Sequence, residues 1–413
     1  MKRLCLIVLI VVAMVGFALA QRTYSVEGAI PDTYFGMTIH HADAGSPWPS
    51  FPVHTMRMWD VVFWRQIQTS PTEYNWKKFD TYIDLRNRYH VADVLFTFGA
   101  TPTWNTTNPK ETKCVEGPGS CYPPANLELF KAFVTQLTQR YCGIVRYYEI
   151  WNEADSKTFW AGTPAELVKL AEVEYPIVKS RENCACDSQG CGPHHHGENP
   201  NLVLSPNITH LGAVNWLKQF MDAGGARYVD VLSFHGYGYI PGPEGVENDL
   251  NTYKETLHMR LPMWDTESNF MNTKDMPNPA DQVSWMARTY LIKWPMGVSR
   301  YYWYAFDNGN WGTMWRKESG ETEVSRAYAN LQKWMVGATE SCTVRDKLWV
   351  CTFHRPDRYV GYAVWSAGAP MKYKVPEGVE QSRDLSGKED HIRPGQEITV
   401  TTMPVLLENK RAW

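Results

Sequence analysis

The feature that most constrains the fold is an alternation of short β-rich runs with helical patterns, repeated eight times between residues 33 and 306. Several of the runs are almost continuously apolar, as expected of parallel strands that are covered on both faces. We therefore predict an α/β protein with a (β/α)8 TIM barrel. The runs are 33–41, 54–60, 92–100, 145–153, 202–207, 229–237, 261–268 and 300–306.

The segments between these runs carry apolar residues at three- and four-residue spacing, which indicates amphipathic helices. Thr163 and Glu166 form a capping-box pattern with Pro164 at the first helical position. A doubly wound open sheet is the main alternative, but such sheets usually have a Gly-rich phosphate turn, which this sequence lacks. The clearest helical patterns are 75–90, 126–141, 163–180, 281–294 and 325–338.

The two ends of the chain differ from the barrel pattern. Residues 1–20 contain a Lys-Arg pair, an apolar stretch and a final Ala-Leu-Ala, which predicts a signal peptide cleaved after about Ala20. An uncleaved membrane anchor is the alternative. Short β-rich runs with turns between them begin after the last helix pattern and predict a small antiparallel domain. The expected division is a signal peptide at 1–20, a barrel at 21–338 and a β-sandwich-like domain at 339–413.

Composition limits the partners of the chain. The net charge is −3 and the basic residues are scattered, so we expect no nucleic-acid binding. We expect a secreted or periplasmic monomer that does not contact a membrane once the signal peptide is removed. The 18 tryptophans are more informative, because an indole offers a flat apolar face to a sugar ring.

The cysteines predict disulfides. There are nine, and Cys5 leaves with the signal peptide, so an even set remains in an exported chain. We predict the pairs Cys114–Cys121 and Cys342–Cys351. The pairing of the other four stays open; they are Cys142, Cys184, Cys186 and Cys191.

The segment 184–200 also contains three consecutive histidines, which raises the alternative of a zinc site. Adjacent histidines diverge, whereas the ligands of a metal must converge. A disulfide-braced surface loop is therefore the favoured interpretation, and we predict no metal and no cofactor.

Polar residues coincide with the ends of several predicted strands. In a barrel of this type, the catalytic groups lie at the carboxyl ends of the strands. A single Glu at such a position is more often a helix-entry charge, but several polar strand ends together favour a site. The strand-end residues are Arg57, Asn152, Glu153, His235, Tyr237, Glu267 and Trp303.

Two of these residues, Glu153 and Glu267, are carboxylates expected on different walls of one pocket. Cleavage of a glycosidic bond needs one carboxylic acid to protonate the departing oxygen. It also needs a second carboxylate on the other face of the sugar. The pair therefore predicts glycoside hydrolysis.

The stretches Trp151-Asn152-Glu153 and "WDTES" resemble the acid/base and nucleophile strands of clan A glycoside hydrolases. Within that clan, "YEIWNEAD" followed by "FWAGTPAELVKLA" is most similar to family 39 and its neighbours, with family 5 close behind. The usual Asn-Glu-Pro is replaced here by Asn152-Glu153-Ala154. The resemblance covers roughly residues 31–338.

The resemblance implies a role for each strand-end residue. Glu153 would be the general acid/base and Glu267 the nucleophile of a retaining reaction, with the carboxyls about 5–5.5 Å apart. Arg57 would be the counter-charge of Glu267, and the Tyr237 hydroxyl would donate a hydrogen bond to it. Asn152 would bind the 2-hydroxyl of the sugar.

The remaining candidates would shape the pocket. His235 would bound the pocket or bond a sugar hydroxyl, with a structural histidine as the alternative. Trp303 would form the floor under the reacting ring, and Trp104 and Trp311 would line a cleft for further sugars. Asn207 begins a glycosylation sequon, as does Asn105, but Asn207 also ends a strand and is expected to contact the pocket.

The sequence therefore predicts a secreted retaining glycoside hydrolase that cleaves β-glycosidic bonds in a polysaccharide or oligosaccharide by double displacement. The number of tryptophans favours endo action. An exo-acting, xylosidase-like glycosidase is one alternative, and a non-catalytic glycan-binding barrel is another.

Overall fold

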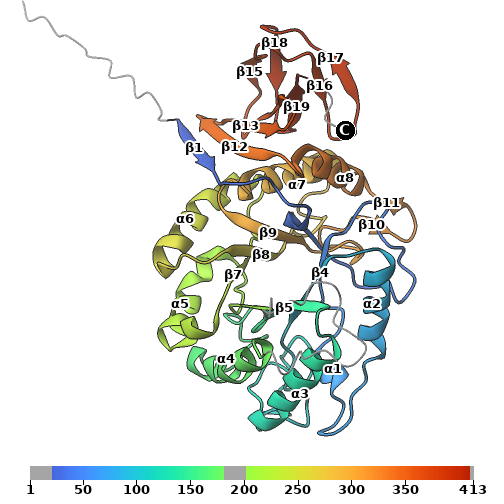
Figure 1. Ribbon diagram of the computed structural model, residues 1–413, viewed down its shortest axis with the longest axis vertical. Helices are drawn as coiled ribbons and strands as arrows, with labels where there is room; N and C mark the ends of the chain where they lie inside the picture. The colour runs from blue at the N-terminus through green and yellow to red at the C-terminus, as the bar shows by residue number, and fades with distance from the viewer. Residues whose placement is uncertain (1–20, 181–200, 410–413) are drawn as a thin grey trace, which may run out of the picture.

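Eight parallel strands form a closed barrel in the computed structural model, which describes residues 21–180 and 201–409 (Figure 1). The strands follow the order β6-β5-β4-β3-β2-β9-β8-β7, and a parallel bridge between Leu204 and Val231 joins the two outer strands. Each predicted β-rich run overlaps one strand, and β9 begins two residues before its run, so the barrel prediction is confirmed. The strands are β2 (Phe35–Thr38), β3 (Thr55–Arg57), β4 (Asp93–Thr97), β5 (Val145–Glu149), β6 (Leu202–Leu204), β7 (Leu232–His235), β8 (Met263–Ser268) and β9 (Val298–Trp303).

Helices surround this barrel (Figure 1). The predicted capping box is present, because Thr163 Oγ1 accepts from the Glu166 N–H at 3.2 Å and Glu166 Oε2 accepts from the Thr163 N–H at 2.8 Å. In the described residues, no helix has the length and apolar character needed to cross a membrane. The helices are α1 (Trp64–Ile67), α2 (Lys77–Arg88), α3 (Leu127–Arg140), α4 (Pro164–Val178), α5 (Val214–Asp222), α6 (Val246–Leu257), α7 (Pro279–Lys293) and α8 (Glu323–Met335).

The interior of the barrel is layered. An apolar layer contains the buried side chains of Tyr147, Trp264 and Tyr302. Because side chains alternate along a strand, the residue two positions further on faces the same interior. Glu149 and Thr266 therefore point inward one layer nearer the carboxyl ends of the strands, where Thr266 Oγ1 donates to Glu149 at 2.7 Å. This polar layer lies directly beneath the candidate site.

The second sheet is antiparallel and has the order β1-β12-β13-β14-β19-β16-β17. It begins with β1 from the start of the described chain, and Figure 1 shows β1 beside β12. We propose a domain boundary at Thr339, with β1 added to the second domain. The strands are β1 (Arg22–Ser25), β12 (Thr339–Arg345), β13 (Leu348–Arg355), β14 (Tyr359–Ser366), β16 (Gln381–Arg383), β17 (Glu389–His391) and β19 (Val405–Glu408); two separate pairs are β15 (Met371–Lys374) with β18 (Glu397–Val400), and β10 (Trp315–Arg316) with β11 (Gly320–Glu321).

This sheet packs against α7 and α8 (Figure 1). Trp349 and Trp365 stack on each other and belong to the same buried cluster as Trp285 of α7. The Ser284 hydroxyl of α7 donates to the carbonyl of Thr402 at 2.7 Å. The barrel and the second sheet thus share one continuous apolar core.

Both predicted disulfides are present, Cys114–Cys121 and Cys342–Cys351. The second joins directly paired residues of β12 and β13. Cys142 is disulfide-bonded as well. The predictions for the signal peptide, for Cys184, Cys186 and Cys191, and for the loop at 184–200 lie outside the described residues. Disulfides of this kind are typical of an oxidising compartment.

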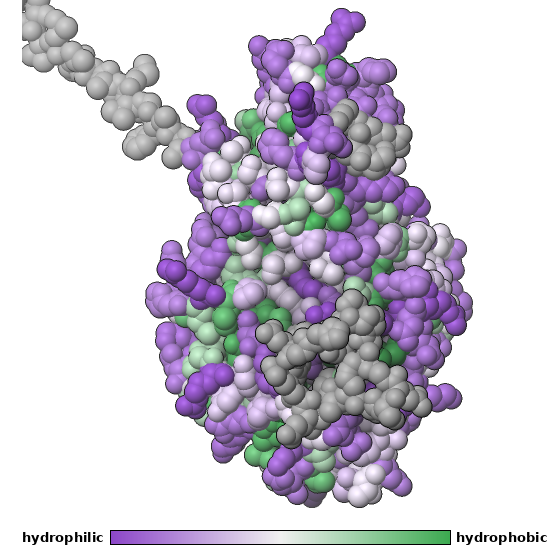
Figure 2. Space-filling view, viewed as in Figure 1, coloured by the Kyte–Doolittle hydropathy of each residue, from purple (hydrophilic) through white to green (hydrophobic). Residues whose placement is uncertain are grey.

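Figure 2 shows one face of the molecule, on which hydrophilic residues cover most of the described surface. The hydrophobic residues on this face form small, separate patches. Scattered apolar residues of this kind are ordinary for a protein surface.

Candidate active site

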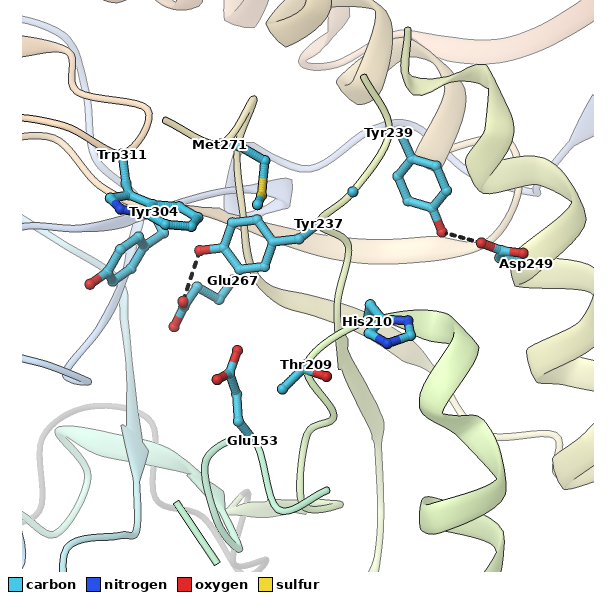
Figure 3. Close-up of a pocket in the computed structure, with 11 residues that line it drawn as sticks. Glu153, Thr209, His210, Tyr237, Tyr239, Asp249, Glu267, Met271, Tyr304 and Trp311 are labelled. Atoms are coloured by element: carbon cyan, nitrogen blue, oxygen red, sulfur yellow. Dashed lines mark hydrogen bonds between the residues drawn. The ribbon is translucent and has the colours of Figure 1, made fainter. Parts of the chain in front are cut away.

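A cavity of about 540 Å³ lies at the carboxyl ends of the barrel strands, and Figure 3 shows the side chains around it. Glu153 and Glu267 point toward each other from different walls of this cavity. Its lining consists of Glu153, Thr209, His210, Tyr237, Gly238, Tyr239, Asp249, Glu267, Met271, Tyr304 and Trp311.

Glu153 follows β5 in a backbone conformation that is unusual for a residue with a side chain. Its φ is +42°, in the left-handed region, which costs roughly 1–2 kcal/mol for an L-residue. Asn207 offsets this strain, because its side-chain oxygen accepts from the Glu153 N–H at 2.6 Å and its carbonyl accepts from the Ala154 N–H at 3.1 Å. The segment after β6 thus fixes the position of the Glu153 carboxyl.

Glu267 lies near the end of β8, where an irregular register brings it to the pocket. Thr266 already points into the barrel, so regular alternation would turn Glu267 away from it. The pairing of β8 shifts register next to both β7 and β9, and such a shift re-aims a side chain. Glu267 Oε2 accepts from Arg57 Nη1 at 2.6 Å, and its Oε1 accepts from the Tyr237 hydroxyl at 2.8 Å.

His235 lies between the two carboxylates. Its Nδ1 is 2.9 Å from Glu153 Oε1, and its Nε2 is 3.9 Å from Glu267 Oε2. One ring nitrogen of His235 and one carboxylate oxygen from each glutamate all lie within 4.8 Å of one another. His235 is fully buried. Its contact with Glu153 restricts the orientation of that carboxyl.

The charges in this group shift one another's pKa values. Burial raises the pKa of Glu267 above its ordinary range, opposed by the positive charges of His235 and Arg57 and reinforced by the negative charge of Glu153. Burial lowers the pKa of His235, but the charge of Glu267 and the hydrogen bond to Glu153 outweigh it, so the net shift is upward. Burial raises the pKa of Tyr237 well above 10, and its hydroxyl remains a donor to Glu267.

Arg57 connects Glu267 to Glu149, a residue that the sequence analysis did not identify. The Glu149 carboxylate accepts from Arg57 Nη2 at 2.9 Å and from Thr97 Oγ1 at 2.8 Å. Arg57 Nη2 also donates to Asn152 Oδ1 at 2.8 Å. Burial alone would raise the pKa of Glu149, but Arg57 and the surrounding donors lower it below its ordinary value of 4.5. Glu149 could have been found from its inward alternation with Tyr147.

Replacement of Glu149 by Gln is expected to lower the free energy of unfolding by about 3 kcal/mol at pH 7, because it leaves a buried guanidinium short of one carboxylate. The pKa of Glu149 is lower in the folded state, so its contribution is complete above pH 4.5 and is lost as the pH falls through the folded pKa. The difference from the wild type should therefore shrink below pH 4.5. Urea denaturation at several pH values measures it.

Glu174→Gln is the matched control. Glu174 is equally buried, but burial raises its pKa, the opposite direction to the shift of Glu149, and the substitution leaves the Arg57–Glu149 ion pair untouched. A comparable loss of stability in both variants, or a difference for Glu149→Gln that does not depend on pH, would contradict the assigned ion pair.

Of the three tryptophans predicted at the pocket, Trp303 is misplaced and Trp311 lines the cavity, while the position of Trp104 in a cleft for further sugars stays a prediction. Trp303 is completely buried, and its indole N–H donates to the Gly312 carbonyl at 2.7 Å. It packs against Trp285 of α7 because its neighbour Tyr302 occupies the barrel interior. Trp104 is half-buried and donates to the Gln68 carbonyl at 3.3 Å, and it is not among the described residues that line the cavity. Trp311 lines the cavity as predicted.

Tyr304 takes the place expected of Trp303. It lines the cavity beside Trp311, and its hydroxyl donates to Asp60 at the end of β3. Asn207, expected as a pocket contact, instead braces Glu153. The side chains of both sequon asparagines, Asn105 and Asn207, are buried.

The three groups Glu153, His235 and Glu267 are close enough together to be considered as metal ligands. Arg57 already places a cation 2.6 Å from Glu267, and repulsion from this guanidinium disfavours a divalent ion at the same carboxylate. The arrangement fits two carboxylates that act directly on a substrate.

Comparisons with known proteins bear on the sequence family and on the fold. A family model described as the glycosyl hydrolase catalytic core matches residues 194–328, which include Glu267. No curated protein sequence matches the chain at a significant level.

Several solved structures have the same fold. A family 39 glycoside hydrolase from Bacteroides cellulosilyticus WH2 has 16% identity and a TM-score of 0.66, with 91% of this chain and 80% of that chain covered. A family 30 endoxylanase from Clostridium papyrosolvens C71 has 13% identity and a TM-score of 0.61, covering 93% and 97%. A family 44 xyloglucanase from Paenibacillus polymyxa has 13% identity and a TM-score of 0.56, covering 94% and 97%.

The family model and the barrel together confirm the predicted class: the chain has the catalytic core of a glycoside hydrolase. The structural neighbours come from families 39, 30 and 44, in agreement with the predicted clan A resemblance. A carbohydrate substrate follows from this class.

Proposed function

We propose that the protein is a secreted, retaining, endo-acting glycoside hydrolase that cleaves β-linked polysaccharide. The observation that carries this proposal is the approach of the two carboxylates. A carboxylate oxygen of Glu153 lies within 4.8 Å of a carboxylate oxygen of Glu267. Retaining enzymes keep their two carboxyl groups about 5–5.5 Å apart, whereas inverting enzymes leave about 6.5–9.5 Å for a water molecule. The spacing favours retention.

In the first step, a Glu267 oxygen forms a bond to the anomeric carbon while the bond to the leaving oxygen breaks. Glu153 gives its proton to that oxygen. In the second step, water attacks the same carbon and the ester to Glu267 breaks. Glu153 takes the proton of the water, which regenerates both carboxyl groups for the next cycle.

The surrounding contacts distinguish the two roles. Glu267 accepts from a guanidinium and a tyrosine hydroxyl, and both bonds favour the ionised nucleophile against the burial that raises its pKa. Glu153 has His235 as its neighbour and faces the open cavity, where a leaving group can reach it. The Asn152 oxygen is occupied by Arg57, so its amide N–H groups are oriented to donate, as binding of a sugar 2-hydroxyl requires.

The shape of the site favours a chain that continues past the reacting sugar. A second cavity of about 420 Å³ adjoins the first and shares Tyr304 and Trp311 with it. A cleft with two compartments accommodates several sugars, which suits endo action. The similar endoxylanase and xyloglucanase support a polysaccharide substrate. The disulfides and the predicted signal peptide support secretion.

A product analysis tests this proposal. The purified full chain is incubated with plant and microbial β-glycans, and the anomeric configuration of the first products is followed by NMR. Oligosaccharides formed with retained configuration are expected. Inverted products would overturn retention, and single sugars alone would indicate an exo-acting glycosidase. Glycan binding without any cleavage would favour a non-catalytic barrel.

A further inference from the structure

The second cavity contains polar groups that the proposed reaction does not use. Asp60 enters it from the end of β3, and Glu116 enters from the loop closed by the Cys114–Cys121 disulfide. Tyr304 and Trp311 separate this cavity from the catalytic carboxylates and line both compartments. A sugar bound there would therefore be joined to the sugar that reacts.

The two carboxyl groups make the second cavity acidic, and a bound cation would favour the ionised form of both. Burial, and next the charge of Asp60, raise the pKa of Glu116 to about 7. Arg65 opposes this shift, but its guanidinium is already engaged with the backbone carbonyl of Glu116 and with the Thr103 hydroxyl at 3.2 Å. In the described part of the chain no cation forms an ion pair within 4.0 Å of the Glu116 carboxyl, so a positively charged ligand would add a direct partner and lower its raised pKa.

His40 adds an unpaired polar atom to the same cavity. Its side chain is 7% exposed, and its Nε2, 3.9 Å from Asp60, has no hydrogen-bond partner in the described part of the chain. Burial lowers the pKa of His40, which favours the neutral imidazole. A buried polar atom without a partner is unfavourable, so this nitrogen is suited to a ligand hydroxyl or amine.

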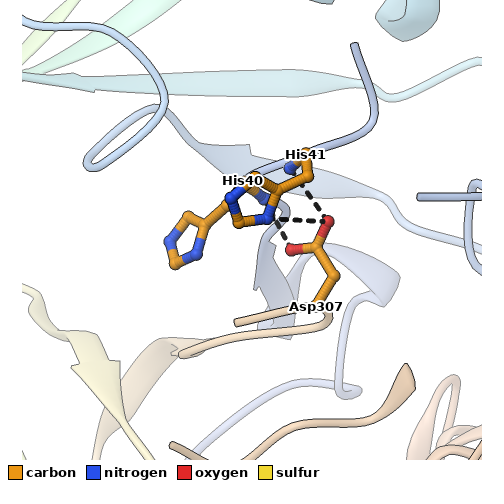
Figure 4. A group of neighbouring side chains, drawn as sticks. All are labelled: His40, His41 and Asp307. Carbon is orange, nitrogen blue, oxygen red and sulfur yellow. Dashed lines mark hydrogen bonds and ion pairs between the residues drawn. The ribbon is translucent and has the colours of Figure 1, made fainter. Parts of the chain in front are cut away.

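Asp307 holds His40 in this orientation (Figure 4). Its two oxygens accept from the backbone N–H groups of His40 and His41, at 2.7 and 2.9 Å. Figure 4 shows the His40 ring turned away from Asp307, whereas the His41 ring lies near it, at 3.7 Å. One ligand atom from each of the three residues lies within 4.8 Å of the others, but both Asp307 oxygens already accept from backbone N–H groups, so Asp307 serves to fix the loop.

We propose that the second cavity binds a sugar with a free, positively charged amino group, and that the substrate is a β-linked glycan containing de-N-acetylated hexosamine. This inference rests on the proposed function and names the substrate class of the same cleft. An ammonium group would form charge-assisted hydrogen bonds to Asp60 and Glu116. Tyr304 and Trp311 would add aromatic faces that attract a cation. A uronic acid would be repelled by the same carboxylates.

Three β-1,4-linked hexamers that differ only at carbon 2 test this proposal. They are the glucosamine hexamer, its N-acetylated counterpart and cellohexaose, and each is titrated calorimetrically into the full-length Glu267→Gln variant at pH 6 in EDTA. The glucosamine hexamer is expected to bind roughly tenfold to a hundredfold more tightly than the other two, as is typical for charge-assisted bonds. High salt should reduce this preference.

Substitutions assign the preference to the cavity. Glu116→Gln and Asp60→Asn, each added to the same variant, should reduce the affinity for the glucosamine hexamer toward that for cellohexaose. Asparagine tolerates the left-handed φ of +60° at position 60, so Asp60→Asn is expected to fold. Glu128→Gln, which removes an exposed carboxylate on α3, is the control and should change nothing.

Equal affinities for the three hexamers, absence of binding, or a preference that survives both substitutions would overturn the inference. Calcium chloride alone is titrated separately, and calcium binding that depends on Glu116 without any preference for the amine would also overturn it. The proposed function is judged independently by the product analysis. Retained products from neutral glycans combined with equal hexamer affinities would leave the hydrolase proposal intact and remove only this inference.

Discussion

Replacement of Glu267 by Ala is expected to reduce turnover of the polysaccharide roughly 10⁵-fold, because loss of a covalent nucleophile removes the intermediate itself. The protein should stay folded, since Arg57 keeps its ion pair with the fully buried Glu149. Reducing-sugar release and circular dichroism measure the two effects. Glu174→Gln, at a buried carboxyl on α4 away from the cavity lining, is the control and should retain wild-type activity.

Azide provides a sharper test of the assigned role. In Glu267→Ala a small anion can occupy the space left by the carboxylate and attack an activated aryl β-glycoside directly. A single displacement inverts the anomeric carbon, so the product should be an α-glycosyl azide, while Glu153 remains in place. A β-glycosyl azide, or substantial activity without azide, would contradict the assignment of Glu267 as nucleophile.

The barrel could be predicted from the sequence because burial on both faces leaves a strong pattern. A run such as "ADVLFTFGA" has few other uses than a covered parallel strand, and eight such runs with helices between them leave few alternative folds. The second sheet was predictable for a different reason, because short β-rich runs separated by turns are typical of antiparallel strands. The sequence signal for the pairing of β1 with β12 was weaker, because a four-residue strand at the edge of a sheet shows little hydrophobic pattern.

The main groups of the site were also predictable, since carboxylates are unusual at the ends of apolar runs. The structure brings Glu153, Glu267, Arg57, Tyr237, Asn152 and His235 together, and the contacts of Arg57 and Tyr237 with Glu267 are those expected. The approach of the two carboxylates could not be predicted from spacing alone. It depends on the left-handed backbone at Glu153 and on the shifted register of β8.

The errors arise where the sequence does not reveal which face a side chain occupies. The run "RYYWYAF" is aromatic at successive positions, so either parity could face the interior. The structure places Tyr302 inside, which turns Trp303 outward to α7 and leaves Tyr304 at the cavity. A one-residue difference in register exchanges the two faces of a strand.

Replacement of Glu153 by Ala is expected to have an effect that depends on the leaving group. With polysaccharide, loss of the general acid should lower kcat/KM by about 10²–10⁴-fold. With a dinitrophenyl glycoside the leaving group needs no proton, so formation of the glycosyl-enzyme should be almost unaffected. Hydrolysis of that intermediate should slow, because no base activates the water. Stopped-flow absorbance should therefore record a burst of dinitrophenolate equal in concentration to the enzyme.

Azide again separates the two roles, with the opposite stereochemical result. In Glu153→Ala it should accelerate the second step, because an anion attacks the glycosyl-enzyme without needing a base, and two successive inversions give a β-glycosyl azide. Opposite configurations from Glu153→Ala and Glu267→Ala would assign acid/base and nucleophile within one experiment. The same configuration from both, or loss of activity independent of the leaving group, would contradict the division of roles inferred from the hydrogen bonds of Arg57 and His235.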